Sequence, residues 1–147
     1  SSGVPLIISV PGKKPAVCDS LVELIDLYPT VSSLCGLDVP DRLQGVDISR
    51  MFDDPNQEVR DAAFSVAPMR KGFLLREHDY AYIQYGDDAA AGIELFDMRT
   101  DPKQYTNLVN NPDYRQVVAR LQATMAEKLD EIRHNDLPVR SSSRRER

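Results

Sequence analysis

The chain has 147 residues, 41% of them hydrophobic and 28% charged, and a formal net charge of −5 at pH 7. This composition is typical of a globular domain with one core, which excludes disorder of the whole chain. No run of about 18 apolar residues is present, so the sequence predicts no membrane-spanning helix. The acidic balance argues against nucleic acid as the main partner.

Two local features narrow the range of partners further. Residues 139–147 read VRSSSRRER, and because only Val139 is apolar we expect a disordered basic tail, with contact to an anionic polymer as the alternative. Cys18 and Cys35 are the two cysteines of the chain. Neither has a CxxC partner or a neighbouring histidine, which argues against zinc, and we expect both to be buried thiols.

The first predicted element is a strand at residues 4–10, VPLIISV, which ends at Pro11-Gly12. A run that is apolar on both sides suits a strand in the middle of a sheet covered by helices on both faces. Such a strand needs neighbours on each side. We therefore expect its sheet partners to lie in a longer protein, upstream of this chain.

The next predicted elements are a short strand at residues 20–25 and a helix at 27–35. Asp26 stands where an N-cap is wanted, and Pro29 falls in the first turn, where a missing N–H does no harm. Gly36 stands at the left-handed position that commonly ends a helix. The apolar residues expected on one face of this helix are Leu27, Val31, Leu34 and Cys35.

Residues 38–58 are predicted to form a loop with one helical turn, because proline and glycine interrupt the stretch repeatedly. Strand-like segments joined by short turns then predict a small antiparallel sheet. These segments are 62–68, the two halves of a hairpin at 72–85 around a polar turn at 77–79, and 93–98 after a second turn at 86–92.

A long helix is predicted from residue 112 to about residue 134. Asn111 is the expected N-cap, Pro112 the first helical residue, and Asp113 a favourable charge in the first turn. The apolar positions recur at intervals of three and four, which predicts that one helix face packs on the sheet. They are Val118, Leu121, Met125, Leu129 and Ile132.

The segment that joins the last strand to this helix resembles a family signature. Residues 94–108, ELFDMRTDPKQYTNL, resemble the C-terminal signature of type I sulfatases, in which a Glu-Leu-Tyr/Phe-Asp strand is followed by Asp-Pro, Asn-Leu and a closing helix. The positions that match are Glu94, Leu95, Phe96, Asp97, Asp101, Pro102, Asn107 and Leu108. Polar groups among them could be mistaken for ligands, but we expect Asp97, Asp101 and Asn107 to hold turns.

Three upstream stretches resemble other elements of the same family, in the same order. Residues 4–12 resemble a strand of the large sheet, and residues 21–40 resemble the helix that follows it. Residues 43–48, LQGVDI, resemble a Gln-Gly-x-Ser-Leu element, with Asp47 in place of the usual Ser. The resemblance covers residues 4–133. Within the family, the iduronate-2-sulfatase branch is most similar, on the stretches 18–30, 74–83 and 92–98.

The resemblance implies an α/β fold of the alkaline-phosphatase-like superfamily, of which this chain is the C-terminal portion. That portion comprises a last strand of the large sheet and then a small antiparallel sheet packed by a C-terminal helix. The end of the large domain is expected at residues 1–60, the C-terminal subdomain at 61–138 and the basic tail at 139–147.

The family's chemistry implies groups that this chain does not carry. Type I sulfatases use a formylglycine made from Cys or Ser in Cys-x-Pro-x-Arg, together with a calcium ion. Cys18 is followed by DSLV and Cys35 by GLDV, so neither matches. We expect formylglycine and calcium in the parent enzyme and no catalytic or metal residue here. The implied partners are the N-terminal catalytic part and a sulfated carbohydrate, and the implied location is periplasmic, secreted or lysosomal.

The candidate substrate-binding residues are Lys71, Arg76 and His78, which border the predicted hairpin. Surface charge or a turn role is the alternative for each. Two acidic pairs could bind a cation but lack the ligand spacing of a calcium loop, so solvated charge is favoured. These pairs are Asp53-Asp54 and Asp87-Asp88. His134 is expected to serve the helix dipole, and Tyr80, Tyr82 and Tyr85 to pack in the sheet rather than bind sugar.

Three functional hypotheses follow. The first is the C-terminal part of a sulfatase that hydrolyses sulfate esters of a sugar polymer. The second is a stand-alone, non-enzymatic α+β interaction module. The third is a fragment of a related phosphonate or phosphate monoester hydrolase with the same scaffold, which only an upstream nucleophile motif would distinguish from a sulfatase.

Overall fold

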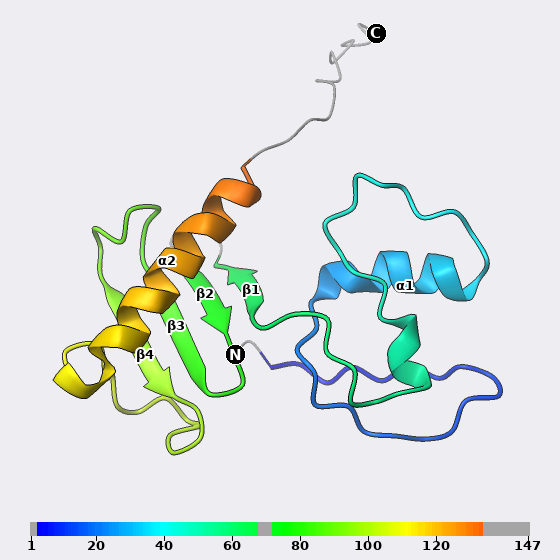
Figure 1. Ribbon diagram of the computed structural model, residues 1–147, viewed down its shortest axis with the longest axis horizontal. Coiled ribbons are helices and arrows are strands. Elements are labelled where there is room, and N and C mark those ends of the chain that lie inside the picture. The colour runs from blue at the N-terminus through cyan, green and yellow to red at the C-terminus, as the bar shows by residue number, and fades with distance from the viewer. Residues whose placement is uncertain (1–2, 68–71, 134–147) are drawn as a thin grey trace, which may run out of the picture.

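The computed structural model describes residues 3–67 and 72–133. A helix and long loops make up the N-terminal part, and a four-stranded sheet covered by a second helix makes up the rest (Figure 1). The elements, in chain order, are η1 (Leu24–Asp26), α1 (Leu27–Leu34), η2 (Ser49–Phe52), β1 (Ala63–Val66), β2 (Phe73–Arg76), β3 (Tyr80–Gln84), β4 (Ile93–Asp97), η4 (Pro112–Tyr114) and α2 (Arg115–Glu131).

The sheet has the order β1-β2-β3-β4, and each neighbouring pair is antiparallel. This confirms the predicted strands and both predicted turns. In the register, Leu75 lies opposite Tyr82, and Tyr82 lies opposite Leu95, so three neighbouring strands place a fully buried side chain in one row. The resulting apolar row is the surface on which α2 packs.

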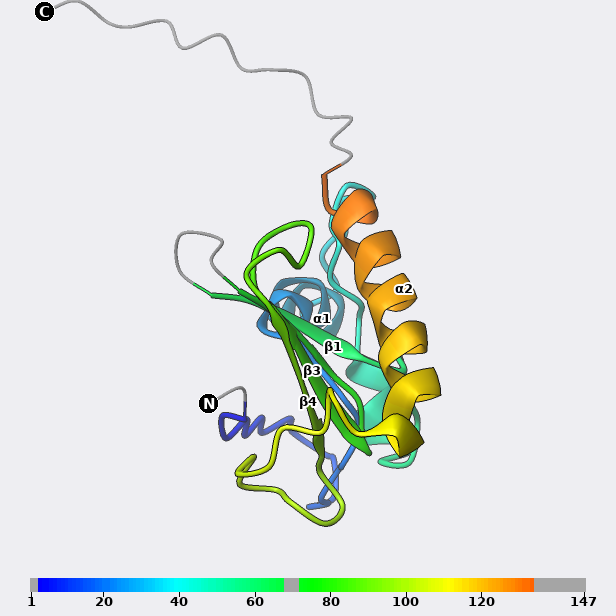
Figure 2. The ribbon, with the colours of Figure 1, turned by 90° about the vertical axis from the view of Figure 1, so that its left-hand side faces the viewer.

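The helix α2 lies along one face of the sheet, as Figure 2 shows. Leu121, Met125 and Leu129 are buried in a single cluster with the strand residues Phe73 and Tyr82, which confirms the predicted stripe. Burial of such side chains contributes about 1.5–3 kcal/mol each. The contact of this one helix face with the sheet therefore accounts for the core of the C-terminal part.

The start of this helix is also as predicted, with one difference in its first turn. The Oδ1 of Asn111 accepts from the backbone N–H of Asp113 at 3.0 Å, and Pro112 takes the first position. The first turn is a 3₁₀ turn, η4, before the α-helix proper begins at Arg115. The helix ends at Glu131, earlier than the predicted residue 134, and His134 lies outside the described residues.

Side chains close hydrogen-bonding sites on both outer strands of the sheet. On β1, the N–H of Phe64 donates to the Oε1 of Glu23 at 2.9 Å. On β4, the N–H of Leu95 donates to the Oδ1 of Asn107 at 3.0 Å, and its carbonyl accepts from Leu108 at 2.8 Å. Unpaired edge groups are templates for unwanted strand pairing, so these contacts protect the sheet.

Several expectations for the N-terminal part are wrong. Residues 20–25 form no strand, because the carboxylate of Asp26 accepts from the N–H of Glu23 at 2.7 Å and closes a 3₁₀ turn there. Cys18 and Cys35 are both exposed rather than buried. Residues 4–10 take no regular secondary structure and pair with no strand among the described residues, so their place in a large sheet stays a prediction.

Replacing Leu121 by Asp should unfold the C-terminal part, because an unpaired carboxylate in this core costs several kcal/mol. Ala123→Asp adds the same charge on the exposed side of α2 and should leave the melting temperature nearly unchanged. Thermal unfolding followed by circular dichroism measures both variants. Equal melting of Leu121→Asp and the unchanged chain would contradict the packing of α2 on the sheet.

Candidate functional site

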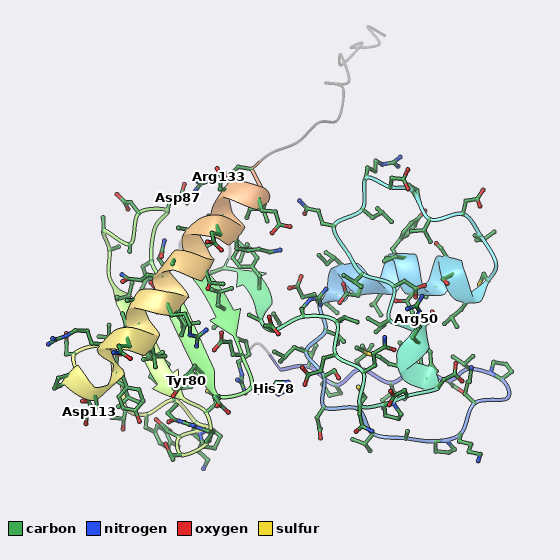
Figure 3. The ribbon with its side chains drawn as sticks, viewed as in Figure 1. Arg50, His78, Tyr80, Asp87, Asp113 and Arg133 are labelled. Atoms are coloured by element: carbon green, nitrogen blue, oxygen red, sulfur yellow. The ribbon has the colours of Figure 1, made fainter. Side chains whose placement is uncertain are left out.

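Two of the three substrate-binding candidates from the sequence, Arg76 and His78, lie among the described residues, at the β2–β3 hairpin. The guanidinium of Arg76 donates to the carbonyls of His78 at 3.1 Å and Tyr80 at 3.4 Å, and burial lowers its pKa. The exposed imidazole of His78 lies 3.7 Å from the carboxylate of Glu58. Lys71 lies outside the described residues. Arg76 therefore braces the hairpin, and His78 lies at its exposed end, as the label in Figure 3 shows.

The acidic pairs are engaged in local contacts. Asp53 pairs with Lys13, and Asp87 pairs with Arg133 at 2.8 Å. Asp54 and Asp88 each accept from a backbone N–H two residues further along the chain. In the part of the chain that the structure describes, no group of three or more His, Cys, Asp or Glu residues could hold a metal ion.

The tyrosines of β3 take different places. Tyr82 is fully buried under α2. Tyr85 lines a groove on the opposite face of the sheet, and its hydroxyl donates to the carboxylate of Glu94 at 3.3 Å. Tyr80 packs edge-on against Tyr114. The three side chains therefore form no common platform for a sugar.

A run of exposed apolar side chains extends along η1, α1 and the loop that follows. We call it the α1 patch, and it consists of Leu24, Ile25, Tyr28, Val31, Leu34 and Leu37, each at least 37% exposed. The buried residues of α1 are instead Pro29, Thr30 and Ser32. Of the apolar stripe predicted for this helix, Val31, Leu34 and Cys35 are exposed and Leu27 is half-buried. Exposed apolar side chains that gather in this way mark an interaction surface.

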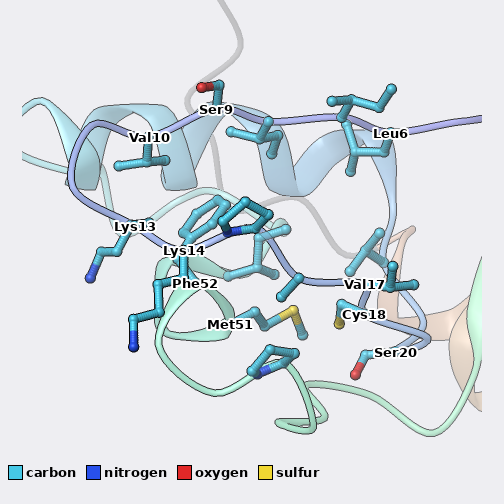
Figure 4. A pocket seen from close by; sticks show the side chains of 17 residues that line it. Leu6, Ser9, Val10, Lys13, Lys14, Val17, Cys18, Ser20, Met51 and Phe52 are labelled. Atoms are coloured by element: carbon cyan, nitrogen blue, oxygen red, sulfur yellow. The ribbon is translucent and has the colours of Figure 1, made fainter.

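A groove lies beside the N-terminal segment, with a volume of about 560 Å³. Residues 6–18 form one wall, and Met51 and Phe52 of η2 form the other, as Figure 4 shows. Lys13 and Lys14 stand at one end. Ile7 and Val17 of the same segment are 91% and 86% exposed. The N-terminal segment therefore presents a second uncovered apolar surface.

A buried carboxylate fixes the α1 patch relative to the sheet. Asp26 is completely buried, and its two oxygens accept from the backbone N–H groups of Glu23 at 2.7 Å and Val46 at 2.8 Å. Both terminal nitrogens of Arg60, which precedes β1, complete the set. The sequence suggested that the side chain of Asp26 caps α1. Asp26 is at the N-cap position, but its side chain makes no capping hydrogen bond. It ties three separate segments together.

The charge of Asp26 is kept by these donors. Burial raises its pKa, but the hydrogen bonds from Arg60, Glu23 and Val46 outweigh burial and hold the pKa below its usual value. The attraction is mutual, because the hydrogen bonds to Asp26 raise the pKa of Arg60. Asp26 and Arg60 therefore form a charged pair inside the fold.

The element at residues 43–48 closes over the same place. A Cβ on Gly45 would lie 2.1 Å from the carbonyl oxygen of Ile25, so no other residue fits there. The hydroxyl of Thr30 donates to the carbonyl of Asp26 at 2.6 Å and accepts from the N–H of Ile48 at 3.0 Å. Asp47, which replaces the family's usual Ser, accepts from Ser49 at 2.8 Å.

The polar residues after β4 are also bound internally. Asp97 accepts from the side chain of Arg99 at 2.6 and 2.9 Å, from its N–H at 3.0 Å and from the hydroxyl of Tyr114 at 3.4 Å. Asp101 accepts from the N–H of Thr106 at 2.8 Å. Asn107 accepts from Leu95 and from Val109. These contacts hold the exit from the sheet, which is the structural role that the sequence predicted.

The family is decided by comparison with known domains. Residues 1–133 match the family described as N-sulphoglucosamine sulphohydrolase, C-terminal. The chain belongs to this family. It is therefore a sulfatase C-terminal domain, and the sheet with its closing helix is that domain's antiparallel subdomain.

Individual relatives agree with this assignment. Arylsulfatase K from Bos taurus is 31% identical over 121 residues, which are 74% of this chain and 22% of the relative. The structure of a 2-O GAG sulfatase superposes with a TM-score of 0.63 at 24% identity, over 74% of this chain and 24% of that one. A phosphonate monoester hydrolase from Silicibacter pomeroyi gives 0.68 at 22% identity, over 87% and 28%. These two likenesses show the fold.

The sulfatase C-terminal domain accounts for only part of each relative. The chain spans 28%, 22% and 27% of the length of three curated relatives that it matches. Most of the length of each of these relatives therefore lies outside the part that this chain matches. No helix among the described residues is long and apolar enough to cross a membrane.

Acid should weaken this domain partly through Asp97. Arg99 holds the pKa of Asp97 at about 2, below the value of about 3.9 in an unfolded chain. The ionised carboxylate therefore stabilises the fold above about pH 4, and this contribution is lost as the pH falls towards 2. Asp97→Asn should lower the free energy of unfolding at pH 7, and the difference should shrink between about pH 4 and pH 2.

Urea unfolding across this pH range measures the effect. Asp41→Asn, at an exposed loop position, is the matched control and should show little difference at any pH. A loss for Asp97→Asn that stays constant down to pH 2 would contradict the role of the ionised carboxylate.

Proposed function

We propose that this chain is the C-terminal part of a sulfatase that hydrolyses sulfate esters of a sulfated sugar or glycosaminoglycan. The observation that carries the proposal is the family match over residues 1–133. In the relatives, the matching region is less than a third of the protein. In this proposal the chain completes the fold and borders the substrate cleft, and it supplies no nucleophile.

The N-terminal catalytic part of the same protein is the proposed occupant of the α1 patch. Six apolar side chains stand exposed there around Asp26, which the buried contacts hold in a fixed place. Burial of that patch against a second surface would contribute about 25 cal/mol for each Å² removed from water. A stand-alone module would have to leave this surface in water, so the patch supports a fragment over a module.

The same reasoning supports the proposed division of the chain. Residues 1–60 would belong to the large α/β domain, with residues 4–10 as one of its strands, and residues 61–138 would form the C-terminal subdomain. The end of the sheet that carries Arg76 and His78 would border the substrate cleft. The division falls between Arg60 and β1, at the ion pair with Asp26.

The reaction chemistry would come from the catalytic part. Neither cysteine of this chain stands in a Cys-x-Pro-x-Arg motif, and the described carboxylates do not gather into a set that fits calcium. The formylglycine and the calcium implied by the family are therefore assigned to the parent's N-terminal part. The residues of this chain would hold the surface on which that part docks.

For the substrate, we propose a 2-O-sulfated uronic acid of a glycosaminoglycan. The stretches 18–30, 74–83 and 92–98 resemble iduronate-2-sulfatase, and one structure of the same fold is a 2-O GAG sulfatase. The second candidate is a phosphonate monoester hydrolase, because such an enzyme from Silicibacter pomeroyi has the same fold with a TM-score of 0.68.

An activity assay separates these functions. The full-length protein should hydrolyse 4-nitrophenyl sulfate and release sulfate from a 2-O-sulfated disaccharide, whereas the chain alone should show no turnover above heat-inactivated protein. A phenylphosphonate monoester is the competing substrate. Faster turnover of that ester than of either sulfate would favour the second candidate, and turnover by the chain alone would contradict the missing nucleophile.

The docking surface can be tested by charge. Val31 is 52% exposed in the chain, so Val31→Asp should change the stability of the isolated chain by no more than about 0.5 kcal/mol. In the full-length protein the same carboxylate would be buried against the catalytic part and should cost several kcal/mol. Ala123→Asp, on the exposed side of α2, is the control in both proteins.

Thermal unfolding of the full-length protein gives the result directly. A clear drop in melting temperature for Val31→Asp but not for Ala123→Asp is expected. Equal melting of the two variants in the full-length protein would mean that the α1 patch stays in water.

A further inference from the structure

The loop that leaves β4 carries an exposed aromatic ring beside a cation. Tyr105 is 79% exposed, and the ammonium of Lys103 lies 6.0 Å from the centroid of its ring. An exposed tyrosine offers an apolar face and a polar hydroxyl, and a neighbouring lysine attracts anions. The pair therefore combines the two contacts that a sulfated sugar would need.

The loop is held in shape by its own backbone and side chains. Asp101 accepts from the N–H of Thr106 at 2.8 Å, and its carbonyl accepts from Gln104 at 3.0 Å. Gln104 has a φ of 59°, in the left-handed region that residues other than glycine rarely adopt. Such strain persists where the surroundings hold it, and it is common at ligand sites. The backbone that carries Tyr105 is therefore held by these hydrogen bonds.

The ammonium of Lys103 faces the ring of Tyr105 and no described carboxylate pairs with it. The nearby Arg99 is engaged by Asp97 at 2.6 Å and Asp79 at 3.5 Å. One carboxylate oxygen of Asp101, Oδ2, accepts from the backbone N–H of Thr106. An anionic ligand at this loop would therefore meet the ammonium of Lys103.

We propose that Tyr105 and Lys103 form a surface site that binds a sulfated carbohydrate chain, at the end of the sheet that also carries Arg76 and His78. The C–H face of a pyranose ring would pack on Tyr105, and a sulfate group would pair with Lys103. The choice of a sulfated sugar rests on the proposed function. The loop lies at the end of the molecule away from α1 (Figure 1).

Binding of a heparin oligosaccharide to the full-length protein, measured by titration calorimetry, tests the site. Tyr105→Ala and Lys103→Ala should each weaken binding by about fivefold, the scale of one exposed stacking or cation contact. Tyr105→Phe keeps the ring and should keep the affinity. Lys14→Ala removes a positive charge from another exposed lysine and should bind as tightly as the unchanged protein.

Kinetics and melting exclude the competing explanations. Turnover of 4-nitrophenyl sulfate and the melting temperature should be the same in Tyr105→Ala as in the unchanged protein. Unchanged heparin affinity, an equal loss with Lys14→Ala, lost turnover of the small ester or a lower melting temperature would each overturn the proposal. Absence of any sulfatase activity would overturn the proposed function instead, since heparin binding is measured without turnover.

Discussion

The N-terminal part of this structure depends on one buried carboxylate. Asp26 has no contact with water, and four donors from three segments of the chain hold it as an anion. A buried charge without partners is very costly, so this arrangement forms only when all three segments are in place. The position of α1, the loop at residues 43–48 and the start of β1 are therefore set together.

This constraint explains why Thr30 of α1 is buried while Val31 and Leu34 are exposed. Thr30 faces inward because its hydroxyl connects the carbonyl of Asp26 to the N–H of Ile48. Val31 and Leu34 are consequently turned outward, at 52% and 37% exposure. The helix is amphipathic in the usual sense, but its polar side contacts this chain and its apolar side is available to another surface.

The C-terminal part could be predicted from the sequence almost completely, because each of its elements is specified locally. Alternation marked the strands, glycines and acidic residues marked the turns, and the spacing of Leu121, Met125 and Leu129 marked the buried helix face. The N-terminal part could not be predicted in this way. No sequence pattern around Arg60 indicates that its partner, Asp26, lies 34 residues away. The alternation at residues 20–25 predicts a strand, but the carboxylate of Asp26 accepts from the N–H of Glu23 and favours a 3₁₀ turn instead. Asp26 is held in place for this bond by its tertiary contacts. The exposure of Cys18 and Cys35 could not be predicted for a related reason. The sequence pattern around a residue does not show whether another part of the chain packs over it.

The candidate site followed the same division. The sequence identified the residues of the sheet exit and their structural role, because short polar side chains near turns bond to adjacent backbone. It did not identify the α1 patch as an exposed surface. The same periodicity is found in a helix that packs against its own chain and in a helix that packs against another protein surface. Contact partners, rather than periodicity, distinguish the two.

The contact between Glu23 and the N–H of Phe64 also has a consequence for the order of assembly. Glu23 belongs to the N-terminal part, yet it closes a donor on the outer strand of the C-terminal sheet. While the chain is being synthesised, β1 is made after Glu23, so the residue that shields the strand is already present when the strand emerges. Cleavage between these two segments, followed by their separation, would remove Glu23 and leave the N–H of Phe64 unpaired on the outer strand of the released piece. The outer strand is therefore best protected against unwanted strand pairing when the two parts remain one continuous polypeptide.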